Sequence, residues 1–197
     1  MKNFLLLALL SLSFTVFAQK KKSVSKVKTE TTKSFAKADN LSAEIIGSNF
    51  VLSIDNKTAL KDTILLSKTL DKKLPIDCKI QAFSAKGTPL YLVSWSEKSK
   101  IESKLSKEDV TVINSVIVNL ATKSKIHSNK QLSSEITLIQ YLDVKQTVSE
   151  TVQKRHSEGF AFTLLPDGDV IKKSKTKEVR YTYSKADNFY EEFKKKK

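Results

Sequence analysis

Apolar residues at every second position constrain the fold of this chain more than any other feature. In the stretch CKIQAFSAKGTPLYLVSWSE, residues 78–97, two such runs meet at Lys86-Gly87-Thr88, which predicts a β-hairpin with its bend there. The second arm has Tyr91, Val93 and Trp95 on one face and leucines on the other. Because this arm is apolar on both sides, we expect it to be a central strand.

The same alternation recurs along the chain. It predicts further strands in NFVLSID, DTILLSK, SEITLIQYLD and EVRYTYS, with a polar turn at Asn56-Lys57-Thr58 between the first two. The fold class expected is mainly β: antiparallel sheets built from hairpins, with one or two short helices. An α+β fold is the alternative.

One segment leaves the choice between helix and strand open, and a second predicts a short helix. Residues 106–120 have apolar side chains at helical spacing, but their dense valine and isoleucine favours a strand. In residues 144–159, Thr147 and Glu150 have the spacing of a capping box, valines recur four apart, and Gly159 follows. We therefore expect a strand in the first segment and a short helix in the second.

The stretch GFAFTLLPDGDVIKK, residues 159–173, places Asp167 and Asp169 around Gly168. A calcium loop needs about six or more oxygen ligands, and no further acid follows before Glu178. Proline followed by Asp-Gly is turn chemistry, since glycine supplies the positive φ that closes a hairpin. We interpret the aspartates as part of a hairpin turn.

Candidate reactive residues are few. Cys78 shares a strand face with apolar Ile80, which favours a buried side chain over a nucleophile acting with His127 or His156. One cysteine closes no intramolecular disulfide, and the cysteine and histidines lack the paired spacing of a zinc site.

Two clusters also have a functional interpretation that we do not favour. Arg155, His156 and Glu158 could act as an acid–base group, but their adjacency spreads them around the expected helix as a solvated face. Tyr91 and Trp95 could form an aromatic platform for a sugar or peptide, but aromatic residues at strand spacing favour a core. The sequence thus assigns no catalytic, cofactor-binding or metal-binding residue, and the residues that bind any ligand stay unknown.

The first eighteen residues, MKNFLLLALLSLSFTVFA, have the order of a secretory signal peptide: a lysine, an apolar run and a small residue before Gln19. The run is too short to span a bilayer of about 30 Å, and no cysteine at its end could carry a lipid anchor. We expect export to the periplasm or the extracellular space, with no transmembrane segment in the mature protein. Residues 19–37 are expected to be a disordered basic linker, residues 38–193 a single β-rich domain, and residues 194–197 a basic tail.

The formal net charge of +14 lies mostly outside the expected domain. Residues 38–193 hold 23 Lys+Arg and 20 Asp+Glu, a net of +3, whereas residues 19–37 hold seven lysines against one glutamate. Only Arg155 and Arg180 are arginine, so the bidentate donor favoured for phosphates and bases is scarce. We expect no nucleic-acid partner, and at most weak contact of the lysine-rich ends with anionic envelope polymers or lipids.

The lysine bias is typical of an AT-rich genome, which together with the leader indicates a bacterial envelope source. The function expected is that of an exported binding or structural protein of the cell envelope, without enzymatic activity. One alternative is an exported enzyme whose site gathers acids or histidines from separate strands. Another is an inhibitor or immunity-type protein that blocks another protein through a sheet edge.

Overall fold

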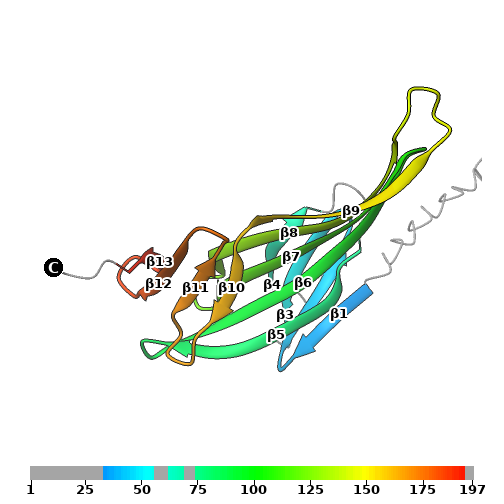
Figure 1. Ribbon diagram of the computed structural model, residues 1–197. Coiled ribbons are helices and arrows are strands. Elements are labelled where there is room, and N and C mark those ends of the chain that lie inside the picture. Colours follow the sequence, from blue (N-terminus) through cyan, green and yellow to red (C-terminus); the bar gives the residue numbers. More distant parts are fainter. Residues whose placement is uncertain (1–32, 56–61, 69–73, 194–197) are drawn as a thin grey trace, which may run out of the picture.

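The computed structural model describes residues 33–55, 62–68 and 74–193. This described part forms thirteen strands in three antiparallel sheets and contains no helix (Figure 1). The mainly β fold built from hairpins is therefore confirmed. The predicted leader, the linker as far as Thr32, the turn at Asn56-Lys57-Thr58 and the tail from Lys194 lie outside the described residues.

The three sheets follow one another along the chain. The first contains β1 (Lys33–Ala38), β2 (Leu41–Ile46), β3 (Asn49–Ile54) and β4 (Asp62–Lys68). The second, which we call the central sheet, contains β5 (Ile76–Ala85), β6 (Thr88–Glu102), β7 (Ser106–Asn119), β8 (Ser124–Tyr141) and β9 (Ser149–Gly159). The third contains β10 (Ala161–Leu164), β11 (Val170–Lys173), β12 (Glu178–Ser184) and β13 (Phe189–Glu192).

Two separate cores lie on the two faces of the central sheet. On its first face, Val93 and Trp95 of β6 pack with Phe50 and other residues of the first sheet. On its second face, Leu90 and Leu92 of the same strand pack with residues of the third sheet, among them Tyr183. The two faces of β6 thus contribute to different cores, which explains why it is apolar on both sides and confirms it as a central strand.

The predicted hairpins form as the turn chemistry requires. Ala85 pairs with Thr88, so Lys86 and Gly87 make a two-residue bend in which both residues have positive φ, 47° and 76°. Residues 106–119 are strand β7, because side chains rich in valine and isoleucine pack between β6 and β8. The hairpin predicted with its bend at Lys86-Gly87-Thr88 and the strand predicted in residues 106–120 are both confirmed.

The helix expected in residues 144–159 is wrong. Residues Ser149–Gly159 form β9, which pairs with β8 from Tyr141↔Ser149 to Gln131↔Gly159. The expected capping box does not form, because Thr147 donates its backbone N–H and its hydroxyl to Asp143 instead. The long β8 offers a full ladder of backbone hydrogen bonds, which the helical spacing of a few valines does not outweigh.

The predicted linker ends too late. Residues 33–37, expected to be disordered, belong to β1, and Phe35 packs on the first core with its ring edge-on to Phe50 at 5.9 Å between centroids. One aromatic side chain and pairing with β2 order this lysine-containing strand. Strand β13, which no sequence pattern indicated, pairs with β12 and buries Tyr190.

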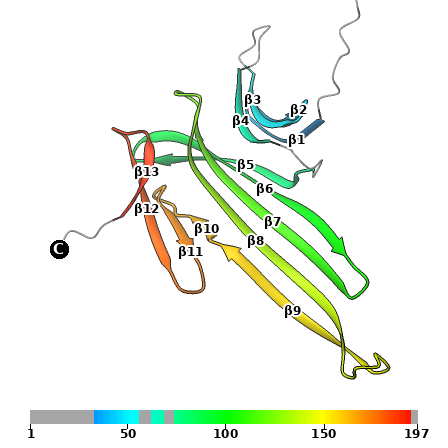
Figure 2. The same cartoon turned by 90° about the horizontal axis from the view of Figure 1, so that it is seen from above.

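The central sheet is longer than the sheets that cover it. Strands β6, β7, β8 and β9 run on past both the first and the third sheet, towards the loop between β8 and β9 (Figures 1 and 2). We call this projecting part the distal sheet; it comprises residues 97–102 of β6, 106–112 of β7, 132–141 of β8 and 149–158 of β9. Its two faces continue the first and second faces of the central sheet, because paired residues on neighbouring strands point to the same side.

Candidate functional site

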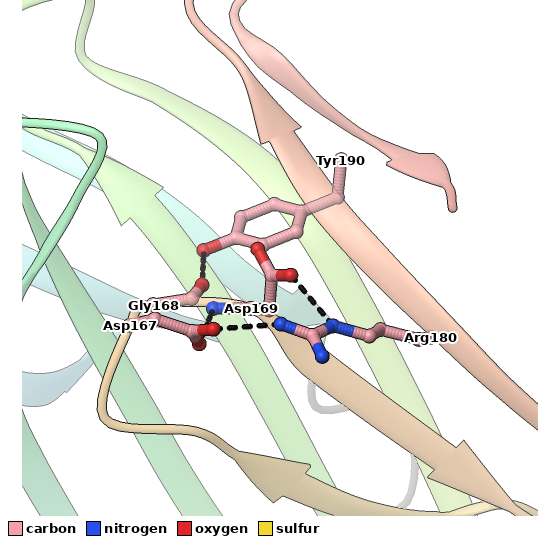
Figure 3. A network of polar contacts seen from close by, with 5 residues as sticks. All are labelled: Asp167, Gly168, Asp169, Arg180 and Tyr190. Carbon is pink, nitrogen blue, oxygen red and sulfur yellow. Dashed lines mark hydrogen bonds and ion pairs between the residues drawn. The ribbon is translucent and has the colours of Figure 1, made fainter. Parts of the chain in front are cut away.

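The aspartates around Gly168 belong to a tight turn and bind Arg180 (Figure 3). Leu165 accepts a hydrogen bond from the Gly168 N–H, which closes the turn, and Asp167 Oδ1 accepts one from the Asp169 N–H at 3.0 Å. Arg180 of β12 donates from Nε to Asp169 Oδ2 at 2.7 Å and from Nη2 to Asp167 Oδ2 at 2.6 Å. These bonds and the two carboxylates raise the pKa of Arg180. The predicted turn is confirmed, and both of its acids are bound by one arginine from the neighbouring strand.

The same turn docks onto the central sheet. Tyr190 donates its hydroxyl to the carbonyl oxygen of Gly168 at 2.7 Å, and its pKa is raised, mainly by burial (Figure 3). A Cβ on Gly168 would lie 2.6 Å from the carbonyl oxygen of Ser84 and 2.7 Å from Cα of Ala85. The aspartate turn therefore seats the third sheet against the end of β5, and its contacts are those of a packing element.

Cys78 and His127 lie on opposite faces of the central sheet. Cys78 packs against the first core, and burial raises its pKa to about 11. His127 lies on the second face among Phe162, Tyr181 and Tyr190, where burial and, to a smaller extent, the charge of Lys172 lower its pKa to about 4. The fold does not bring this cysteine and this histidine together as a reactive pair.

The cluster at the end of β9 is divided between two faces by the strand. His156 Nε2 and Glu158 Oε1 lie 2.9 Å apart on the first face, and Arg155 Nη2 binds Glu135 Oε1 at 3.1 Å on the second. The expected spread around a helix is wrong because adjacent residues of a strand alternate between its faces. All four side chains are exposed, as the solvated interpretation requires.

Trp95 belongs to the core. It is 3% exposed, its ring lies 5.0 Å from that of Phe50 between centroids, and its Nε1 donates to Glu97 Oε1 at 3.0 Å. Tyr91 is half-buried against the same core. An aromatic platform at these two residues would need exposed rings, so the core interpretation is confirmed.

The first face of the distal sheet carries an uncovered apolar stripe. The strand pairing places on this face the side chains of Ile101, Val110, Val112, Leu132, Ile136, Leu138 and Val152. Ile101 is 57% exposed, the others are half-buried, and none of them belongs to either core. Charged residues such as Glu97, Lys154 and Glu158 border the stripe on β6 and β9. An apolar centre with a charged rim is the pattern of a contact surface.

The loop between β8 and β9 extends the apolar surface to the tip of the molecule. Leu142 is 61% exposed, Val148 is 53% exposed and Val144 is fully exposed. Asp143 accepts hydrogen bonds from the Thr147 hydroxyl and from the Val148 and Thr147 N–H groups, the latter two at 2.9 and 2.8 Å. These bonds, the hydroxyl bond first, lower the pKa of Asp143. The loop is thus ordered by its own polar contacts while its apolar side chains face solvent.

The second face of the distal sheet is mainly polar, although Ile139 and Tyr141 of β8 also lie on it, 41% and 39% exposed. A groove of about 500 Å³ lies between this face and the β11–β12 hairpin, and it is lined by Asp109, Thr111, Ser133, Ser134, Glu135, Arg155, His156, Ser157 and Lys175. Lys100, Asp109, Glu135 and Arg155 form one row across four strands, in which Lys100 pairs with Asp109 at 3.4 Å. Each acid of the row therefore already has a cationic neighbour.

Comparison with known protein families, with curated proteins and with solved structures finds no match for this chain. The class that the structure defines is an all-β protein of three antiparallel sheets, with two cores and a two-faced distal sheet. Within the described ranges no helix is long and apolar enough to cross a membrane. No group of three or more histidine, cysteine or acidic side chains there is placed to hold a metal ion.

Sequence reasoning missed the apolar stripe as a surface. Its residues alternate with polar ones as in any half-buried strand, so the pattern shows that one face is apolar but not whether another layer covers it. The tip could have been found by one signal, the apolar residues Leu142, Val144 and Val148 in a segment that also contains Asp143 and Lys145.

Proposed function

We propose that the protein is an exported binding or structural protein of the cell envelope, without enzymatic activity, whose contact surface is the apolar stripe and tip of the distal sheet. The observation that carries the proposal is the apolar stripe on the first face of that sheet, together with the exposed apolar side chains of the tip. A sheet face with several apolar side chains is normally covered, and here no described segment covers it.

Export is supported by the order of charged, apolar and small residues in the leader. The lysine-rich residues at both ends add weak attraction to anionic polymers or lipid head groups, which strengthens near an anionic surface and weakens with salt. The preferred setting is the periplasm or the outer surface of a bacterium.

An enzymatic role is the second candidate, and the polar groove favours it because the groove gathers the carboxylates of Asp109 and Glu135. His156 also lines the groove, but its imidazole lies beside Glu158 on the first face. Against this role, Asp109 and Glu135 are exposed and ion-paired with Lys100 and Arg155. A general acid or base usually lies in a site that excludes water and shifts its pKa. The groove is therefore the less favoured site.

Site-specific photo-crosslinking in cells that produce the protein tests the proposal. A benzophenone amino acid replaces Ile101 on the first face in one variant and Lys98, exposed on the second face, in the other. We expect crosslinks to an envelope component from position 101 and few from position 98. Crosslinks from position 98 alone would move the contact to the polar face and support the groove.

Mutation of the tip adds a binding measurement. Val144→Ser with Leu142→Ser should reduce co-sedimentation of the purified protein with the envelope fraction, because both side chains are exposed and make no core contact. Leu74→Ser is the matched control, since Leu74 is also exposed but lies outside the distal sheet. Equal binding of both variants and the parent protein would contradict a role for the tip.

A further inference from the structure

Strand β9 presents a free edge. It is the last strand of the central sheet, it pairs with β8 on one side, and no described strand pairs with it on the other. Eleven residues long, it is longer than most edge strands that natural proteins leave open. Such an edge offers a row of backbone donors and acceptors to another strand.

We infer that β9 pairs with β9 of a second copy of this chain, antiparallel and about a two-fold axis at Val152, so that the two central sheets join into one. The inference stands on the strand edge and does not require the proposed function. The charges of β9 are the reason to expect a second copy of this chain, and not another protein, at the free edge.

Four residues of β9 other than histidine are charged, and two of them are already used within the chain. Arg155 binds Glu135, and Glu158 lies beside His156. Glu150 and Lys154 are exposed, point to the first face, and have no ion-pair partner among the described residues. These are the two charges left for a partner.

A two-fold axis at Val152 brings these charges together. A two-fold axis perpendicular to a sheet keeps each side chain on its own face, so each residue meets one an even number of positions away. With Val152 at the axis, Lys154 lies opposite the partner's Glu150, and Glu150 lies opposite the partner's Lys154. Residues 149–155 then pair, with two opposite-charge contacts around a central pair of valines.

The other centres fit less well. With Lys154 at the axis, the whole strand overlaps, but Lys154 meets its own copy and Glu150 meets the partner's Glu158. With Arg155 at the axis, two guanidinium groups face each other, and with Gln153 at the axis, Lys154 faces the partner's Val152. With His156 at the axis, Lys154 would meet the partner's Glu158, but Glu158 already lies beside His156 within its own chain. Like charges opposed across strands are destabilising, so the centre at Val152 is favoured.

The apolar stripe supports the same centre. Val152 pairs with Leu138 on the first face, so the dimer places the leucine and valine of one copy beside those of the other. The stripes of the two copies then become continuous across the new strand pair. The paired residues 149–155 also lie in the distal part of β9, away from Gly159. At Gly159 the chain turns into the third sheet, and a Cβ on this glycine would lie 2.3 Å from the carbonyl oxygen of Lys130.

Charge exchange tests the inference in the chain from residue 19 to residue 197, with mass measured by analytical ultracentrifugation over a range of concentrations. The parent protein should show a concentration-dependent dimer. Glu150→Lys and Lys154→Glu should each weaken it by about tenfold or more, because two attractive pairs become repulsive. The double variant Glu150→Lys with Lys154→Glu should recover dimerisation to within about threefold of the parent.

Glu158→Lys is the matched control, since it makes the same change of charge on the same strand and face but lies outside residues 149–155. It should leave the dimer unchanged, and circular dichroism and melting curves should show that every variant is folded. A dimer weakened as much by Glu158→Lys as by Glu150→Lys would overturn the centre at Val152. A parent protein that stays monomeric would overturn the inference and leave the β9 edge to a strand of a different protein.

Disulfide trapping gives an independent readout. Val152→Cys in a Cys78→Ala background should form a covalent dimer on mild oxidation, because residues related by the axis have Cβ atoms about 4.5–5.5 Å apart. Ser157→Cys in the same background should not, since residue 157 meets no copy of itself. Trapping through residue 157 but not through residue 152 would contradict the proposed axis.

Discussion

At the residue scale, the turn at Gly168 shows how one small residue can join two layers. Gly168 has φ +84°, and the space for a Cβ is taken by the backbone of Ser84 and Ala85. The neighbouring acids bind Arg180, while Tyr190 binds the glycine carbonyl (Figure 3). The turn thus combines a backbone conformation and a close approach that both require glycine.

Gly168→Ala should therefore destabilise the protein more than the same change at Gly47. Gly47 also has positive φ, +61°, but a Cβ on this residue would meet no atom within 4 Å. We expect a loss of about 1 kcal/mol at Gly47 from the backbone conformation alone. At Gly168 the loss should be at least about 2 kcal/mol larger, because the backbone of β5 must move. Chemical denaturation measures both, and equal losses would contradict the docking role of the turn.

The aspartates of the same turn should not respond to calcium. Because Arg180 already occupies Asp167 and Asp169, we expect the melting temperature of the parent protein to be unchanged by calcium. Asp167→Asn with Asp169→Asn should lower the free energy of unfolding by about 1 kcal/mol, as for an exposed ion pair, with or without calcium. Stabilisation of the parent by calcium that the double variant loses would show that the turn binds the ion.

His127 should make the protein less stable in acid. Its pKa is lowered from 6.5 to about 4 by burial and by the charge of Lys172, so between these values the unfolded chain binds a proton that the folded chain does not. Stability is therefore full above pH 6.5, falls as the pH drops towards 4, and loses at most about 3 kcal/mol from this group. The free energy of unfolding measured from pH 7.5 to 4 should be flatter in His127→Phe. Parallel curves for both proteins would mean that His127 titrates normally.

At the scale of the elements, β6 contributes to both cores, as does its neighbour β7 through Val116 and Ile117. Leu90 contacts the second core and Val93 the first, and both side chains are fully buried. The strands of the first sheet contribute only to the first core, and those of the third sheet only to the second core. Loss of packing on one face of β6 should therefore leave the other face in place.

Alanine substitutions on the two faces of β6 test this separation. Leu90→Ala should cost about 2 to 5 kcal/mol and Val93→Ala about 1 to 3 kcal/mol, as buried side chains are removed from tight packing. The double variant should cost their sum to within about 0.5 kcal/mol, because the two side chains share no packing partner. Denaturation of the three variants measures the coupling. A clear departure from additivity would show that the two cores behave as one.

At the scale of the whole molecule, charge and fold are separated along the chain. Residues 19–32 hold five lysines against one glutamate, and residues 194–197 hold four lysines. Residues 38–193, which include nearly all the described strands, are close to neutral with a net charge of +3. Attraction to polyanions should therefore come from the ends of the chain.

Deletion of residues 19–32 and 194–197 should remove most binding to vesicles of anionic lipid while the fold is kept. The deletion spares β1, which begins at Lys33. Each lysine near an anionic surface contributes about 1 kcal/mol and is screened beyond about 8 Å at physiological salt. Binding by the longer chain should therefore be weak and fall with salt. Salt-resistant binding by the truncated chain would assign the contact to the folded sheets.

The strands with a clear alternation, and the turns between them, could be predicted from the amino-acid sequence alone. The hairpin around Gly87, the central position of β6 and the turn at Gly168 all follow from local rules, because side-chain direction in a strand and φ in a turn depend on near neighbours. The burial of Trp95 followed from the same alternation.

Features that depend on partners far apart in the chain could not be predicted in this way. Residues 149–159 form a strand because β8 lies beside them, and residues 33–37 are ordered because β2 pairs with them and Phe35 reaches the first core. Strand pairing likewise placed Arg180 between two aspartates and left the apolar stripe of the distal sheet uncovered. A sequence records which residues are apolar, but hydrogen bonds between strands and the layers above a sheet come from segments far apart in the chain.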